Sequence, residues 1–146
     1  MRDVITYAEL HKIFSRDNYP NLEALKFRDS TYLVPAKEWF DEFFIWHEEV
    51  VELLNTKGWK PNNDCDDKST GLRWLASVCN GQRGEENPAE GIAIGEVSYK
   101  IDNGGWHAIN VAIVGKDHEV RFIEPQRPGW VTLSKAEIKS IRFVMF

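Results

Sequence analysis

The chain has 146 residues, of which 18 are Lys or Arg and 23 are Asp or Glu, so its formal net charge is −5, and 42% of its residues are apolar. A chain of this length buries roughly 70% of its unfolded surface around one core, so we expect a single domain over residues 1–146. This apolar content excludes an intrinsically disordered chain. Because the balance is acidic and the basic residues are scattered, nucleic acid is not an expected partner.

The N-terminal segment has none of the features of a targeting signal. Charged residues occur throughout the first twenty positions, and no apolar run approaches the roughly 18 residues that a transmembrane helix needs. We therefore expect a soluble protein without an N-terminal signal and without a membrane partner, in the cytoplasm or another aqueous compartment.

Two helices are predicted in the N-terminal part, at residues 6–14 and, more clearly, at residues 35–57. In the second, Pro35 is suited to the first turn and Gly58 to the end of the helix. Its apolar stripe consists of Trp39, Phe40, Phe43, Phe44, His47, Val50, Val51 and Leu54. The sequence from His47 departs from the zinc motif HExxH because Val51 takes the second ligand position, so His47 is expected to be a satisfied core histidine.

A third helix is predicted from Cys65 to the Asn80-Gly81 pair, which is a typical helix end. Cys65 then lies in the first turn. Cys79 lies fourteen positions later on the same helix, about 21 Å along its axis, which is too far for a disulfide bond. Residues 80–91 are rich in Gly and charged side chains and are expected to form a surface loop.

The second half of the chain changes to the alternating pattern of strands. Strands are predicted at residues 92–101, 106–114, 120–124 and 141–146, and Ser134 with Glu137 forms a capping-box pattern for a short helix. On the strand at 106–114, His107, Ile109, Val111 and Ile113 share one face. Helices followed by an antiparallel sheet indicate an α+β domain in which the Cys65 helix packs on the sheet.

Three residues with complementary chemistry lie at the ends of these elements. Cys65 opens a helix, where free backbone N–H groups stabilise a thiolate. His107 begins a strand and can accept the thiol proton, and Glu124 ends the next strand and can orient the imidazole. If the two strands form a hairpin, Trp106 or His107 lies approximately opposite Glu124. The catalytic set expected from the sequence is therefore Cys65, His107 and Glu124.

The motifs around these residues resemble a known family. Asp-Cys-Asp-Asp, Gly-Trp-His-Ala-Ile-Asn and Glu-Pro-Gln, within residues 62–126, resemble the papain-like cysteine protease domain at the C-terminal end of the fungal fairy-ring mushroom agglutinin. The first box also resembles bacterial transglutaminase-like cysteine proteinases. The resemblance implies a papain-like or transglutaminase-like fold, a Cys-His-Glu triad, and calcium held by Asp66, Asp67 and Gln126. Lys68-Ser69-Thr70 departs from the more apolar residues expected after the acidic pair.

The negative charge around Cys65 is an independent reason to expect a metal ion. Carboxylates on both sides of Cys65, at Asp64, Asp66 and Asp67, repel a thiolate unless a cation neutralises them, and hard oxygen ligands suit calcium. An EF-hand is excluded because Ser69 and Leu75 stand where that loop requires Gly and Glu. The alternative is that Asp64 caps the helix while Asp66 and Asp67 fill its first turn. The two interpretations are compatible with each other.

The sequence thus predicts a thiol-dependent amide hydrolase of the cysteine protease type, acting on a peptide or protein substrate. One alternative keeps the nucleophile but transfers the acyl group to an amine, as transglutaminases do, or cleaves cell-wall peptides. Another alternative is a non-catalytic, metal-stabilised binding module on the same fold. Product analysis with an added amine separates the first two, and ligand binding after Cys65→Ser identifies the third.

Overall fold

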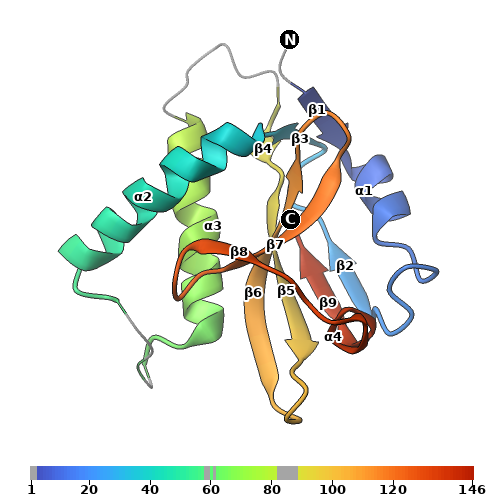
Figure 1. Cartoon of the computed structure of the whole chain (residues 1–146). Coiled ribbons are helices and arrows are strands. Elements are labelled where there is room, and N and C mark those ends of the chain that lie inside the picture. Colours follow the sequence, from blue (N-terminus) through green and yellow to red (C-terminus); the bar gives the residue numbers. More distant parts are fainter. Residues whose placement is uncertain (1–2, 58–59, 61, 82–88) are drawn as a thin grey trace.

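A computed structural model describes residues 3–57, 60, 62–81 and 89–146 (Figure 1). Within them the helices are α1 (Tyr7–Ile13), α2 (Lys37–Leu53), α3 (Cys65–Gly81) and α4 (Lys135–Ser140). The strands are β1 (Asp3–Thr6), β2 (Ala24–Lys26), β3 (Thr31–Val34), β4 (Gly91–Ile92), β5 (Ile94–Lys100), β6 (Trp106–Val114), β7 (Glu119–Glu124), β8 (Gly129–Val131) and β9 (Phe143–Met145). No helix in this part of the chain is long and apolar enough to cross a membrane.

The strands form two sheets. The larger has the order β2-β9-β5-β6-β7-β8, and the smaller has the order β1-β3-β4. Pairing is antiparallel except between β2 and β9 and between β3 and β4, which are parallel. The expectation of a purely antiparallel sheet is therefore corrected, because two short strands from the N-terminal half pair with strands that follow much later in the chain.

Strand β6 lies inside the larger sheet and carries core side chains on both faces. Ile109, Val111 and Ile113 share one face, as the alternation predicted, and pack in a cluster with side chains from α1 and β9. Ala112 and Val114 point to the other face, where α2 and α3 cover the sheet. This second layer contains Phe40 and Leu72, which are completely buried.

The predicted helices agree with the structure apart from their ends. Helix α1 begins after Thr6, whose side chain accepts a hydrogen bond from the backbone N–H of Glu9. Helix α4 has the predicted capping box between Ser134 and Glu137. Helix α2 starts two residues after Pro35 and ends at Leu53, so it is shorter than predicted. Gly58, expected to end it, and residues 82–88 of the expected loop lie outside the described residues.

His47 on α2 is buried, as predicted, with 2% of its surface exposed. It is not satisfied, however, because its Nδ1 atom has no hydrogen-bond partner in the part of the chain that the structure describes. Burial and, to a smaller extent, the nearby positive charge of Lys68 lower the pKa of His47 to about 4, against the opposing charge of Glu48. The imidazole is therefore neutral in the folded protein at physiological pH.

This pKa shift predicts a pH-dependent stability. Between pH 6.5 and 4 the unfolded chain binds a proton at His47 that the folded chain does not, so the free energy of unfolding falls as the pH decreases through this window, by up to about 3 kcal/mol. We expect His47→Leu to remove this slope in urea unfolding curves recorded at several pH values. His11→Leu, at an exposed histidine, is the matched control. Parallel pH profiles for wild type and His47→Leu would contradict the assignment.

Candidate functional site

The N-terminal half of α3 is fixed on the larger sheet by a buried amide. The Asn110 side chain on β6 is completely buried, and its Nδ2 group donates to the carbonyl oxygens of Ser69 at 2.8 Å and of Gly95 at 3.0 Å. Its Oδ1 atom has no hydrogen-bond partner among the described residues. One side chain thus joins α3 to both β5 and β6.

Glu96 on β5 holds the next turns of α3. Thr70 donates to Glu96 at 3.1 Å, and Arg73 forms an ion pair with Glu96 at 3.4 Å. The side chain of Arg73 is only 13% exposed and that of Glu96 only 12%. Such a shielded pair orients α3 more firmly than a surface ion pair does. The position of the helix, and so of Cys65 at its start, follows from these contacts.

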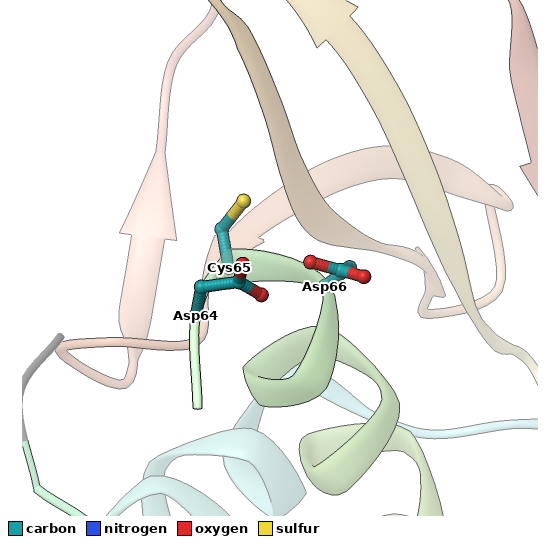
Figure 2. A group of neighbouring side chains, drawn as sticks. All are labelled: Asp64, Cys65 and Asp66. Carbon is teal, nitrogen blue, oxygen red and sulfur yellow. The ribbon is translucent and has the colours of Figure 1, made fainter. Parts of the chain in front are cut away.

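Figure 2 shows the first turn of α3, with the Cys65 sulfur standing clear of the helix. One ligand atom of Asp64, one of Cys65 and one of Asp66 all lie within 4.8 Å of one another. A hydrogen bond with Asp66 is the main cause that raises the pKa of Asp64, followed by burial and by the charges of Asp66 and Asp67. The backbone N–H of Asp67 also donates to Asp64, which is the contact of an N-terminal cap.

The predicted pair of His107 and Glu124 is present. Nε2 of His107 lies 2.8 Å from Oε2 of Glu124, and the two side chains are 19% and 28% exposed. The strand register differs from the prediction. Since Asn110 pairs with Ile123, continuing the ladder places Glu124 across from Ile109, two residues from His107. The imidazole and the carboxylate therefore meet diagonally, within the reach of long side chains on one face.

This hydrogen bond determines the tautomer of His107. Burial alone would raise the pKa of Glu124, but hydrogen bonds from His107 and from the backbone N–H of Gln126 outweigh it and lower that pKa. Glu124 is thus an ionised carboxylate that only accepts, so Nε2 of His107 carries the hydrogen. With the hydrogen on Nε2, Nδ1 is the ring atom that can accept a proton from a neighbouring group.

Tyr99 on β5 packs against this pair. Its ring lies edge-on to that of His107, with 5.8 Å between the centroids. Burial, followed by the charges of Glu137, Glu124, Asp102 and Cys65, raises the pKa of Tyr99 to about 12. Within the described residues no hydrogen bond joins Cys65 to His107, so the structure forms one of the two contacts expected of the triad.

The expected metal ligands are only partly together. The carboxylates that cluster with Cys65 belong to Asp64 and Asp66, and Asp67 is not in this group. Gln126 donates its backbone N–H to Glu124 and lines a hollow of about 300 Å³ with Glu48, Val51, Lys57, Arg127 and Pro128. The paired oxygen donors fit a hard cation, while the set of Asp66, Asp67 and Gln126 stays a prediction.

Sequence reasoning missed two positioning residues, Asn110 and Tyr99. Asn110 had a detectable signal, since it is the only strongly polar residue between Ala108 and Val114 in the chain. A buried amide inside an apolar strand usually satisfies backbone groups of a neighbouring element. Tyr99 had no such signal, because its alternating position is equally typical of a core residue.

Among the solved structures similar to this chain are two that match 98% of its length. One is the PSL1a-E64 complex, with a TM-score of 0.72 and 19% identity. The other is Polyporus squamosus lectin bound to the human-type influenza-binding epitope Neu5Aca2-6Galb1-4GlcNAc, with a TM-score of 0.73 and 21% identity. The chain spans about half the length of each, 50% and 49%. No protein-family model and no curated protein matches the chain.

These matches correct the assignment made from the motifs. At this identity they show the fold alone, and it is the fold of half of a fungal lectin rather than the papain-like or transglutaminase-like fold expected, although both are mixed α and β. The resemblance to a protease domain and the roles of cysteine protease-like hydrolase, acyl transferase and peptide amidase do not stand. Short motifs at the ends of elements indicate local geometry, whereas function depends on the complete site.

The arrangement predicts unequal reactivity of the two thiols. Neither Cys65 nor Cys79 forms a disulfide bond, and both are half-buried, so exposure alone does not separate them. If Nδ1 of His107 and the start of α3 favour the thiolate, iodoacetamide labels Cys65 roughly tenfold faster than Cys79 near neutral pH. Glu124→Gln lowers the Cys65 rate because the imidazole loses its orienting anion. Peptide mapping by mass spectrometry measures both rates, and equal rates in the wild type would rule out an activated thiol.

Proposed function

We propose that the chain is a ligand-binding domain and that its ligand contacts Cys65, His107 and Glu124 at the N-terminal end of α3. The observation that carries this proposal is the 2.8 Å hydrogen bond between His107 and Glu124 on the strands beside the Cys65 helix. An ionised carboxylate and an imidazole of fixed tautomer form a preorganised polar group, which costs little to order when a ligand binds.

The chemistry of these side chains limits the ligand. Nδ1 of His107 accepts a hydrogen bond, the thiol of Cys65 donates weakly, and the carboxylates of Asp64 and Asp66 make the neighbourhood negative. A ligand with hydrogen-bond donors and without net negative charge suits this group. That PSL1a forms a complex with E64 supports the choice of E64 as the first probe.

Protection from labelling tests the proposal. E64 bound at the site is expected to slow iodoacetamide labelling of Cys65 in proportion to its occupancy and to leave Cys79 unchanged. Cys79 thus serves as the internal control, and His107→Ala is expected to weaken the protection. Calorimetric titration of the same variants measures binding without the labelling reagent.

Two outcomes of this test contradict the proposal. One is E64 binding by calorimetry with no change in the Cys65 labelling rate, which places the ligand elsewhere. The other is protection that His107→Ala and Glu124→Gln leave unchanged, since the pair would then take no part in binding.

Carbohydrate binding is a second candidate, favoured by the glycan held by the Polyporus squamosus lectin. The chain covers 49% of that lectin, so glycan binding by this chain is proposed and is not inferred from the activity of the whole lectin. Titration with Neu5Aca2-6Galb1-4GlcNAc, followed by NMR, tests it directly. Absence of any shift at millimolar glycan would eliminate this candidate and leave the proposed Cys65 site untouched.

We also propose that calcium binds beside Cys65. A hydrogen bond with Asp66 raises the pKa of Asp64, and ligand atoms of Asp64, Cys65 and Asp66 lie within 4.8 Å of one another. A cation at these oxygens would neutralise the negative cluster. Asp66, Asp67 and Gln126 remain the predicted ligands, with Asp64 added by the geometry.

Thermal unfolding tests this cation site. Calcium at one hundred times its Kd stabilises the folded state by about 2.7 kcal/mol, so the Tm in calcium is expected to exceed the Tm in EDTA. Asp66→Asn is expected to abolish the difference, and comparison with Asp67→Asn and Gln126→Ala identifies the remaining ligands. Coincident curves for the wild type would leave the three aspartates as ordinary residues of a helix start.

A further inference from the structure

A polar hollow of about 460 Å³ lies at the opposite end of α3 from Cys65. Gly81 lies sixteen positions after Cys65, which is about 24 Å along the helix, so this hollow is separate from the site proposed above. It is lined by residues from the last turns of α3, from β4, from the start of β3 and from the segment that precedes β3. The polar residues that line it are Asp29, Tyr32, Arg73, Ser77, Asn80 and Glu90.

One side of the hollow is built around a buried tyrosine. Tyr32 is 1% exposed, and its hydroxyl oxygen accepts hydrogen bonds from the backbone N–H groups of Arg28 at 3.1 Å and Asp29 at 3.0 Å. These bonds fix the backbone that carries the Asp29 carboxylate. Ser30 and Glu90 close the same side, because the Ser30 backbone N–H donates to the Glu90 carboxylate at 2.7 Å.

A glycine leaves room for the Asp29 carboxylate. A Cβ atom at Gly91 would lie 2.5 Å from Oδ2 of Asp29, closer than such atoms approach in proteins. No hydrogen bond or ion pair of the Asp29 carboxylate is found in the described part of the chain. The carboxylate is half-buried and keeps its acceptor capacity for a ligand.

The charge of the hollow excludes an anionic ligand. Asp29 and Glu90 are acidic, whereas the positive charge of Arg73 is already paired with Glu96 at 3.4 Å. The ionised carboxylates accept hydrogen bonds, while the spare N–H groups of Arg73 donate them. Sugar hydroxyl groups both donate and accept, so a neutral sugar can use both kinds of partner.

We infer that this hollow binds a neutral carbohydrate through Asp29 and Arg73. The inference rests on the carbohydrate-binding candidate above and gives it a location that does not involve Cys65. The probe is the neutral disaccharide Galb1-4GlcNAc, which is the part of the lectin-bound glycan without the acidic sugar. Because the carboxylates of the hollow repel an acidic sugar, we expect the neutral disaccharide to bind at least as tightly as the sialylated trisaccharide.

The test is an NMR titration of the whole chain with Galb1-4GlcNAc. The backbone resonances of Asp29, Ser77 and Gly91 are expected to shift, and Asp29→Ala is expected to weaken binding at least about tenfold. Gly91→Ala is expected to weaken it too, by displacing the Asp29 carboxylate. Asp17→Ala, at an exposed carboxylate outside the hollow, is expected to bind like the wild type. Asp29→Asn keeps the shape of the side chain and provides a second variant if Asp29→Ala does not fold.

The possible failures are distinguishable. Shifts confined to residues near Cys65 and His107 would overturn this location while carbohydrate binding stands. No shift with either glycan would overturn both carbohydrate proposals and leave the E64 experiment to decide the Cys65 site. Tighter binding of the sialylated trisaccharide at this hollow would overturn the inference that its ligand is neutral.

Discussion

The side-chain amide of Asn110 is the contact on which the arrangement of α3 depends. It is completely buried and donates to one carbonyl on α3 and one on β5, while its own strand, β6, lies inside the larger sheet. Removing this amide would break both hydrogen bonds, at a cost of about 0.5–1.5 kcal/mol for each. The contact therefore fixes where the helix starts relative to the strands, which dispersive packing alone specifies less sharply.

Each end of α3, held in this fixed position, contributes side chains to one of the two proposed binding sites. At its start, a thiol and two carboxylates lie in the neighbourhood of the His107 and Glu124 pair, and Tyr99 lies near both groups. At its end, Arg73 and Ser77 face the carboxylates of Asp29 and Glu90 across a polar hollow. Arg73, which is the positively charged side chain among the described residues of that hollow, is the one whose pairing with Glu96 anchors the helix.

Local patterns in the sequence were sufficient for the elements that carry their own signal. The helical spacing of α2 and α3, the capping box at Ser134 and the alternation of β6 were all correct because each is set by nearby residues. The short strands β1, β2, β3 and β8 have three or four residues each and too few alternations to detect. Their partners, such as β9 for β2, are distant in the sequence, so only the folded chain reveals them.

The candidate site was predicted in its parts and misread as a whole. The contact of His107 with Glu124 was correct, although the strands are offset by two residues from the expected register. The pairing of Asp64 with Asp66 and the role of Asn110 depend on side-chain positions that spacing does not encode. The assignment as a protease came from three short boxes, and the matching lectin structures corrected it over nearly the whole chain.

The central claim is that Cys65 and the pair of His107 and Glu124 form one preorganised ligand site, and the nitrogen chemical shifts of the His107 ring test it most directly. In the ¹⁵N NMR spectrum near neutral pH, the account predicts a protonated Nε2 and an unprotonated Nδ1, with an Nδ1 shift that changes in Cys65→Ser and a tautomer preference that is lost in Glu124→Gln. A protonated Nδ1, or a His107 ring unaffected by both substitutions, would contradict the account.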